Sequence, residues 1–405
     1  MAFKDSADTA IPELAGLQRK AAIVGGAAAA VSLVGLLLNP TQFLQSYLMA
    51  YMWCLGATLG CLALGMIHQL SGGEWGVLIR RPTGAASRVL PVLTVLFLPI
   101  ALGMFRLYSW TDASLVGHDE VLHHKHLYLN VPFFLARAVV YFAAWNALAY
   151  FLNRWSLQQD TNPDPRISRR MQKLSGGGLV VYGLTITFAS FDWLMSLDPH
   201  WYSTMYGVLT MGGQALTGIA FLIVVVVWLS RRPPLSAIVL PSHLHDLGNL
   251  MLAFTMLWAY FAFSQYLIIW AGNLPAEIDW YLHRSFTSWR ILALTLIVVH
   301  FAVPFVLLLS RRIKRQAELI VRVAVWVLFA RLIDLLWLIA PAFHHDGFSI
   351  SWMDVTLPTA LGGLWLAAFV WQLRGRAILP VHDPQFDETL GEIIERGQRV
   401  KYTQS

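Results

Sequence analysis

Long apolar runs alternate with short polar segments along almost the whole chain, and this alternation predicts the fold. A helix needs about 20 apolar residues to cross a bilayer, and ten runs approach or exceed that length. They are residues 21–38, 46–67, 89–107, 131–152, 175–197, 206–229, 247–271, 288–309, 318–340 and 355–373. The pattern predicts an all-α polytopic membrane protein with ten transmembrane helices. Pro91, Pro99 and Pro304 fall inside runs, where neighbouring helices can satisfy the freed carbonyl groups, so we expect kinks there.

The composition agrees with a membrane protein and excludes several other classes. Hydrophobic residues make up 57% of the chain and charged residues only 13%, about half the charged fraction of a soluble domain. The basic residues lie in short clusters between apolar runs, which favours lipids as partners and argues against nucleic acid. Cys54 and Cys61 share one run and no Cys-x-x-Cys motif occurs. Covalent haem, an iron–sulfur cluster and a disulfide framework in this chain are therefore not expected.

The distribution of Arg and Lys predicts the orientation. Basic clusters follow runs 2, 4, 6, 8 and 10, and Arg19-Lys20 precede run 1, whereas the loops after runs 1, 5 and 9 contain neither residue. Cytoplasmic loops carry the excess of positive charge, so both termini are expected in the cytoplasm and the protein in the cell inner membrane. The first run is long for a signal peptide and lacks a small-residue cleavage site, so we interpret it as a retained helix.

Two pairs of similar segments predict an internal duplication. Asp192 precedes Pro199 by seven residues, and Asp334 precedes Pro341 by the same spacing. The segment 128–137 also aligns without a gap with 281–290, and Tyr, Leu, Phe and Arg agree in the two. The matching runs are four spans apart, so the copies have the same orientation in the membrane. We therefore expect two parallel-repeat four-helix bundles plus two peripheral helices.

The duplication sets the expected domain boundaries. Helices 2–5 form one bundle, helices 6–9 form the other, and helices 1 and 10 are peripheral. The expected divisions are a cytoplasmic N-terminal segment (1–20), peripheral helix 1 (21–45), the first bundle (46–205), the second bundle (206–345), peripheral helix 10 (346–376) and a cytoplasmic tail (377–405), in which a short amphipathic helix begins near Phe386.

Charged residues inside the apolar runs are the first candidate functional residues. An unpaired Asp at bilayer depth costs roughly 2.5–3.5 kcal/mol, so such a residue normally has a partner or a task. We predict the pairs Arg137–Asp192 and Arg290–Asp334, with Arg331 competing for Asp334 from one helical turn away. The two carboxyl groups either carry protons or form static ion pairs that lock helices together. A carboxylate beside Arg is held ionised, whereas a carrier must change its protonation state.

Polar residues at the cytoplasmic ends of runs 2 and 7 form a second candidate site, a proton entrance. The residues are His68, Glu74, His243, His245 and Asp246. The alternative is that they are ordinary interfacial groups and a helix cap.

The other histidines give weaker signals. His300 is the only His well inside a run, and a single central His cannot supply paired haem ligands. The histidine-rich loop segments 123–126 and 344–346 are more consistent with a hydrated surface that faces a partner than with a metal site, because metal sites need fixed geometry.

Three phrases carry a family resemblance. They are His68-Gln-Leu-Ser-Gly-Gly-Glu-Trp-Gly, Phe191-Asp-Trp-Leu-Met-Ser-Leu-Asp-Pro-His-Trp-Tyr-Ser and Trp280-Tyr-Leu-His-Arg. Together with the ten helices, they resemble the polysulfide-reductase membrane-subunit (NrfD-like) family. Within it the chain is most similar to the shorter of the two such subunits of bacterial alternative complex III, a quinol:electron-acceptor oxidoreductase. The resemblance extends over nearly the whole chain.

The resemblance implies a hetero-oligomeric complex with an iron–sulfur subunit, c-type cytochrome subunits and a longer homologous membrane subunit. Haem c and iron–sulfur clusters are then expected in the partner subunits and quinol in the homologous membrane subunit, with no cofactor in this chain. The implied role is a non-redox subunit that scaffolds the complex, with proton conduction coupled to quinol oxidation as a further role. The alternatives are a quinol-oxidising anchor of a molybdopterin-type oxidoreductase, with its pocket between helices 2–5 near the outer face, and a stand-alone secondary transporter.

Overall fold

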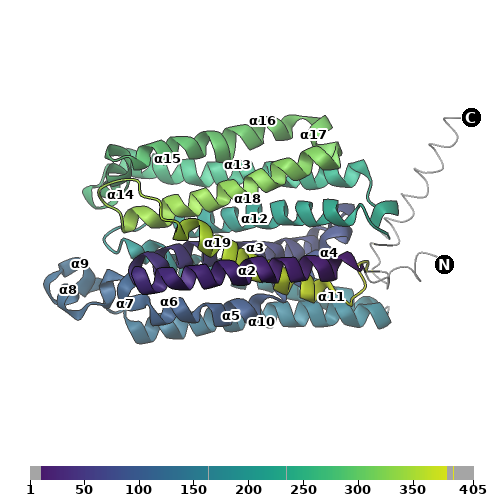
Figure 1. The fold of residues 1–405 in the computed structure, drawn as a ribbon, viewed down its shortest axis with the longest axis horizontal. Coiled ribbons are helices and arrows are strands. Elements are labelled where there is room, and N and C mark those ends of the chain that lie inside the picture. Colours follow the sequence, from purple (N-terminus) through teal and green to yellow (C-terminus); the bar gives the residue numbers. More distant parts are fainter. Residues whose placement is uncertain (1–10, 163, 234, 381–385, 387–405) are drawn as a thin grey trace, which may run out of the picture.

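The computed structural model describes residues 11–162, 164–233, 235–380 and 386, and the regular elements in these ranges are all helices (Figure 1). Ten of the described helical segments are long and apolar enough to cross a membrane, which confirms the all-α polytopic prediction. The first ten residues and nearly all of the predicted tail helix after Phe386 lie outside the described residues.

Eight spans are single α-helices. They are α2 (Glu13–Leu38), α3 (Pro40–Ser71), α10 (Val131–Thr161), α11 (Pro165–Trp193), α12 (Tyr206–Leu229), α13 (Pro241–Gly272), α18 (Ala317–Ile339) and α19 (Met353–Leu373). Several extend beyond the apolar runs by a turn or two, because polar residues at the membrane interface continue the helix.

The other two spans are interrupted near proline. The third span consists of α4 (Glu74–Ser87), α5 (Leu90–Leu96) and α6 (Leu98–Leu102), with Pro91 and Pro99 in the first turns of α5 and α6. The eighth consists of α15 (Trp289–Leu296), the π-helical turn η4 (Ile297–Ala302) and α16 (Val303–Leu309). Proline has no backbone N–H and disrupts the preceding turn, so Pro304 accounts for the irregular backbone just before it. Kinks were predicted at all three prolines, and the helices are interrupted at each.

The helices run side by side, and the bundle has two distinct ends (Figure 1). We call the end at which α2 begins and α19 ends the basic end, because the Arg and Lys clusters of the polar segments lie there. We call the opposite end the loop end. It carries the short helices α7 (Met104–Leu107), α8 (Ala113–His118), α9 (Glu120–Lys125) and α14 (Pro275–Phe286). The helix α17 (Arg311–Arg315) lies at the basic end.

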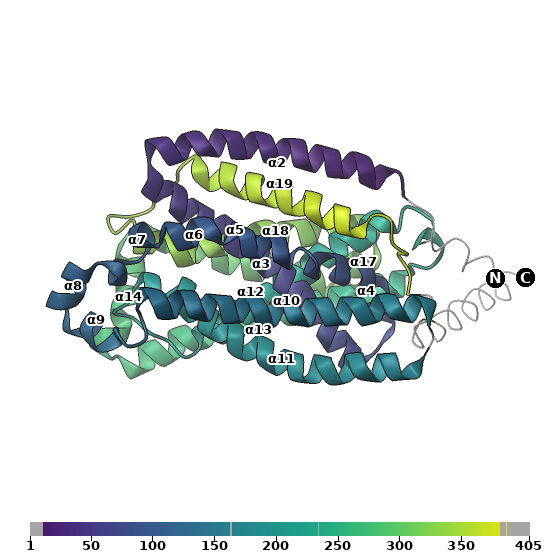
Figure 2. The ribbon, with the colours of Figure 1, turned by 90° about the horizontal axis from the view of Figure 1, so that it is seen from below.

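The same packing order occurs in both halves of the chain. In the first half α3 contacts α4 and α11, and α10 contacts α11 and α5. In the second half α12 contacts α13 and α18, and the eighth span contacts α13 and α18. This is the arrangement that two parallel four-helix units predict. The helices α2 and α19 pack against each other and against α3 at one side, where Figure 2 shows them as an outer pair.

The two halves meet where α3 crosses α12. A Cβ atom added to Gly60 would lie 1.9 Å from the Gln214 carbonyl oxygen, and one added to Gly218 would lie 2.6 Å from the Gly60 carbonyl carbon. The backbones therefore touch, as is common where small residues line a membrane helix interface. Both helices are almost fully enclosed by protein, and α12 has 89% of its most apolar window buried.

We expect Gly60→Ala to destabilise the protein by about 1–3 kcal/mol, because the added methyl group forces two backbones apart. The matched control is Gly177→Ala on α11, where an added Cβ meets nothing within 4 Å. Thermal unfolding of the purified proteins in detergent measures the difference. Equal stability of the two variants would contradict the close approach.

Candidate functional site

Asp192 and Arg137 form the predicted ion pair in the first half. Asp192 is fully buried on α11, and its two carboxylate oxygens accept hydrogen bonds from Arg137 Nε at 2.8 Å and Nη2 at 2.7 Å. Tyr141 on α10 donates a third hydrogen bond to Asp192 at 2.8 Å. Bidentate guanidinium–carboxylate pairs are among the strongest hydrogen-bonded contacts in proteins. The pair thus ties α10 to α11 near the loop end.

The surroundings hold this pair in place. Arg137 Nη1 donates to the Tyr128 carbonyl oxygen at 3.0 Å, and the guanidinium lies 3.8 Å from the Tyr128 ring centroid and 4.2 Å from that of Phe133. Trp145 and Trp193, both fully buried, pack next to Tyr141 in a cluster that also contains Phe97, between α5 and α6, and Phe142 of α10. A carboxylate with three hydrogen bonds and an apolar neighbourhood suits a static ion pair better than a proton carrier.

The second predicted pair, Arg290–Asp334, is wrong. Arg290 is the second residue of α15 and its side chain is exposed, whereas Arg137 lies six residues inside α10. The gap-free alignment placed the loop at Tyr128 opposite Tyr281, which lies in helix α14. The sequence match therefore does not correspond to a structural match at this position. The Asp–Pro match holds only in outline: α11 and α18 are both followed by a 3₁₀ turn, but it begins three residues after Asp192, at Met195–Leu197, and six residues after Asp334, at Ala340–Ala342.

Asp334 is paired with Arg331, the competing partner, one turn away on the same helix. Both side chains are buried, with 3% and 4% exposure, and Arg331 Nη1 donates to Asp334 Oδ2. The guanidinium lies against the backbone of α12, where a Cβ atom on Gly213 would be 2.3 Å from Arg331 Nη2. Glycine is required here because any side chain would occupy the space of the guanidinium.

His300 adds a third polar group to this second-half cluster. It lies in the π-helical turn, is fully buried, and neither ring nitrogen has a hydrogen-bond partner among the described residues. Its ring centroid is 3.9 Å from that of Trp258 on α13, and Arg331 is near enough to repel a charge on the imidazole. His300 is eleven residues from the start of α15, about 16 Å at 1.5 Å per residue, so it lies near the middle of the bundle. π-Helical turns frequently occur at functional sites.

Further polar groups connect this cluster with the loop end. Tyr206, at the start of α12, is 2% exposed and lies within electrostatic range of Asp334 on one side and of Asp198 and Arg284 on the other. Arg284 Nη2 is 3.4 Å from Asp198 Oδ2, and its guanidinium lies 3.5 Å from the Trp280 ring centroid. Burial lowers the pKa of Arg284 to about 10, although Asp198 opposes the shift, so the guanidinium stays charged at neutral pH.

Asp198 and Arg284 line an open cleft of about 570 Å³ at the loop end, between the two halves. Other polar groups in its wall are Asp112, His200, Asp279, His283 and His345. His283 and His345 share a hydrogen bond of 3.0 Å between their ring nitrogens. The cleft gives Asp198 and Arg284 access to the aqueous phase at this end.

Sequence reasoning missed Arg284, Tyr206 and Asp198 as site residues. Arg284 and Asp198 occur in the phrases that carry the family resemblance, so those phrases did contain a signal. Nothing in the sequence indicated that α14 is a helix that turns Arg284 inward, because Pro275–Phe286 is too polar and too short to stand out as an apolar run.

At the basic end the structure joins two of the predicted entrance residues. His243 is fully buried at the start of α13, and its Nε2 lies 3.1 Å from Glu74 Oε2. The backbone N–H of Leu240 donates to His243 Nδ1 at 3.2 Å, so Nδ1 is the acceptor and Nε2 carries the hydrogen donated to Glu74. This hydrogen bond links the third span to the seventh and hence the first half to the second.

His68 lies beside this pair at the sharp turn between α3 and α4. Gly72 and Gly73 have φ of 67° and 104°, and the Gly73 carbonyl lies 3.1 Å from His68 Nε2. A Cβ atom on Gly76 would be 1.6 Å from the His68 ring, so the imidazole fills the space above that glycine. The tight turn that the two glycines permit is present.

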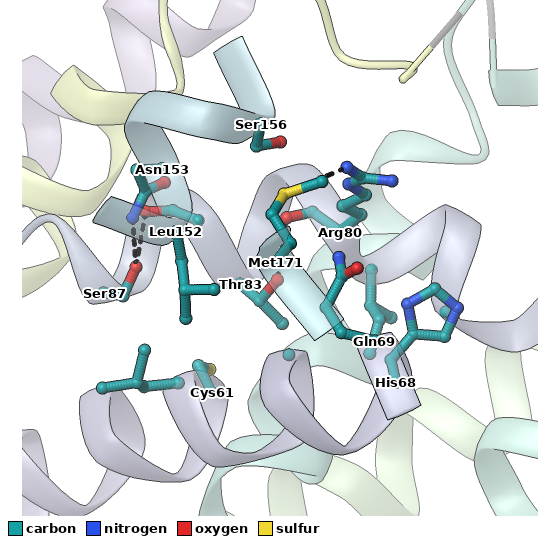
Figure 3. A pocket seen from close by; sticks show the side chains of 15 residues that line it. Cys61, His68, Gln69, Arg80, Thr83, Ser87, Leu152, Asn153, Ser156 and Met171 are labelled. Carbon is teal, nitrogen blue, oxygen red and sulfur yellow. Dashed lines mark hydrogen bonds between the residues drawn. The ribbon is translucent and has the colours of Figure 1, made fainter. Parts of the chain in front are cut away.

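His68 also lines a small pocket of about 50 Å³ (Figure 3). Arg80, Thr83, Asn153 and Ser156 supply further polar groups to its wall, and Met171 lies against Arg80. A polar cavity of this size holds one or two water molecules. The first half therefore has a place for water close to the basic end.

His245 and Asp246 do not join Glu74. His245 lies near Lys314 and Arg315 of α17, and no hydrogen bond or ion pair joins either residue to Glu74 in the described structure. Across the described residues, no group of three or more His, Cys, Asp or Glu side chains is placed to hold a metal ion. This includes the described histidine runs of the loop end.

Comparisons with known proteins add no relative to this picture. No family model matches the sequence, and no curated protein matches it.

We expect Arg137→Leu to cost about 3–5 kcal/mol of stability, because it leaves the Asp192 carboxylate buried without a counter-charge. The double variant Arg137→Leu/Asp192→Leu should recover most of that loss. Arg290→Leu, an exposed arginine at the position expected from the sequence repeat, is the matched control and should change stability by less than about 0.5 kcal/mol. Unfolding in detergent measures all three. Similar losses of stability for Arg137→Leu and Arg290→Leu would contradict the assignment of Arg137 as the counter-charge of Asp192.

Proposed function

We propose that this chain is a cofactor-free integral subunit of a quinol-oxidising respiratory complex of the alternative complex III type, in which it scaffolds the assembly and conducts protons. The resemblance of three sequence segments to the NrfD-like family supports assignment to a complex of the alternative complex III type. The buried polar groups support the proton role. The excess of Arg and Lys at the basic end supports a cytoplasmic location for that end and for both termini in an inner membrane.

The observation that carries the proton role is the series of buried polar groups in the second half. Asp334, Arg331 and His300 lie among apolar helices, and Tyr206 is within electrostatic range both of Asp334 and of Arg284 and Asp198, which line the open cleft. Ionisable groups at membrane depth are costly and typically mark ion or proton paths. Scaffolding alone does not require a fully buried histidine without a hydrogen-bond partner among the described residues.

The two aspartates differ in their suitability as proton carriers. Asp192 accepts three hydrogen bonds from Arg137 and Tyr141, which together stabilise its ionised form. Asp334 accepts a hydrogen bond from Arg331, which lies one turn away on the same helix and packs its guanidinium against Gly213. A rotation of Arg331, which is close to both Asp334 and His300, would free Asp334 to take up a proton. We therefore assign the exchangeable proton to the second half and a structural role to the Arg137–Asp192 pair.

At the other side of the membrane, protons would enter through the basic end. The polar cavity beside His68 provides space for water, and the His243–Glu74 hydrogen bond lies next to it. On α12, Gln214 accepts a hydrogen bond on its side-chain oxygen from Tyr182 at 2.8 Å. Gln214 is adjacent in sequence to Gly213, against which Arg331 packs.

We expect Asp334→Asn to abolish the proton translocation that this subunit adds, while quinol oxidation continues. The amide cannot bind and release a proton in the physiological range, and the asparagine keeps nearly the same shape. The measurement is quinol oxidation and acidification by the purified complex reconstituted in vesicles. The ratio of protons released per electron should fall to the value supplied by quinol oxidation itself.

Asp346→Asn is the control for this experiment, because it removes an exposed carboxylate at the same end of the molecule. An undiminished proton ratio in Asp334→Asn would reject the proton role. Purification of the chain without haem-containing subunits would instead reject the complex and favour a stand-alone transporter.

The second candidate function is a quinol-oxidising anchor, and the loop-end cleft favours it. Its volume of about 570 Å³ is typical of small-ligand sites, and its carboxylate and imidazole groups would accept the protons of a quinol. The cleft lies between the two halves and not between helices 2–5. Photo-crosslinking with an azido-quinone distinguishes the functions: labelling of the cleft favours the anchor, and labelling only of another subunit favours the proposal above.

A further inference from the structure

A large open cavity lies at the basic end, between the start of α2 and the end of α19. Its volume is about 630 Å³. The two helices that form it are fixed against each other, because a Cβ atom on Gly25 would lie 2.7 Å from the Leu364 backbone nitrogen. Ser32 also donates to Thr356 Oγ1 at 3.0 Å. Figure 2 shows this pair at the outer side of the bundle, so the cavity is formed by a rigid, peripheral part of the protein.

One part of the cavity wall is apolar. Ile11, Leu14 and Ala15 contribute from the α2 side, and Trp371 and Leu373 from α19. The Trp371 side chain is 61% exposed, and tryptophans at this height are typical of the membrane–water interface. Beyond the cavity the exposed surface of α2 continues with Ile23 and Val24, which are 59% and 53% exposed. The apolar wall therefore leads directly into the lipid-facing surface.

The opposite part of the wall is cationic. Arg374 and Arg376 line the cavity. Arg374 Nη1 donates to the neutral Gln18 side chain at 2.5 Å, and Arg376 Nη1 is buried without a hydrogen-bond partner among the described residues. Burial lowers the pKa of Arg376, and repulsion from nearby Arg81 lowers it further. A guanidinium nevertheless remains charged at neutral pH.

Among the described residues around these two arginines, the carboxylates are already paired elsewhere. Arg88, which is close enough to Arg376 to repel it, bonds to the neutral groups of Gln372 and Asn153. Arg81 is paired with Asp160. Glu13, at the start of α2, lies 3.6 Å from Arg232. Among the described residues named here, five arginines thus face two carboxylates, and both carboxylates are paired with arginines other than Arg374 and Arg376.

We propose that this cavity binds the phosphate of an anionic phospholipid, with Arg374 and Arg376 contacting the phosphate and the acyl chains lying along α2 and α19. Arginine forks match phosphate geometry, and basic pockets between membrane helices on the cytoplasmic side bind lipid headgroups. Free inorganic phosphate has the same headgroup chemistry. It would leave the apolar side chain of Trp371 exposed to water, so the combination of charge and apolar surface favours the lipid.

The test uses the full-length chain, purified in detergent with any subunits that accompany it and stripped of lipid. Native mass spectrometry measures binding of phosphatidylglycerol and of phosphatidylcholine with the same acyl chains. We expect the wild-type protein to bind phosphatidylglycerol roughly tenfold or more tightly. Arg374→Gln/Arg376→Gln should abolish this preference.

Arg169→Gln/Arg170→Gln is the matched control, because it removes two exposed charges from α11 at the same end and away from the cavity. It should retain the wild-type preference. Ala15→Trp provides an independent variant that fills the cavity and leaves both arginines intact, so it should also reduce phosphatidylglycerol binding. Equal lipid preference in the wild type and in both cavity variants would overturn the proposal. Displacement of the lipid by millimolar inorganic phosphate would also overturn it.

Discussion

A charge inside an apolar helix bundle must have a counter-charge or hydrogen bonds, and this constraint shapes both halves of the protein. Arg137 and Asp192 satisfy it completely, with a bidentate pair, a tyrosine hydroxyl and two aromatic rings. The second half satisfies it only in part, since His300 has no hydrogen-bond partner among the described residues. Two units with the same helix packing thus differ in how completely their buried polar groups are paired. A fully paired site adds rigidity, whereas a partly paired site keeps the freedom that proton transfer needs.

Much of the architecture was predictable, because membrane helices must be long and continuously apolar. The span from Tyr206 to Leu229 was predicted with its observed ends, and the Arg137–Asp192 pair followed from two charges at matching depths. The error at Arg290 arose because sequence identity was taken as spatial equivalence, although α14 lies where the first half has a loop. The π-helical turn around His300 was not predictable from hydropathy, which does not distinguish helical hydrogen-bonding patterns.

Contacts between distant segments were the other part that the sequence did not reveal. The Glu74–His243 hydrogen bond was expected only as proximity at one membrane face, and the structure identifies the partners and the tautomer. Gly213 offers no signal in the sequence, since its role depends on a guanidinium from α18. Arg284 reaches the interior only because α14 turns it toward Asp198. Each of these features depends on helix packing, and periodicity along a single helix contains no information on it.

The direct backbone contact between α3 and α12 also limits how the molecule can move. Gly60 and Gly218 leave no layer of side chains on which one half could slide or tilt against the other. An alternating-access cycle, in which two domains rock about a central ligand, would have to break this contact in every turnover. Any transport through this protein should therefore proceed with a stationary scaffold, by side-chain rotation and rearrangement of internal water.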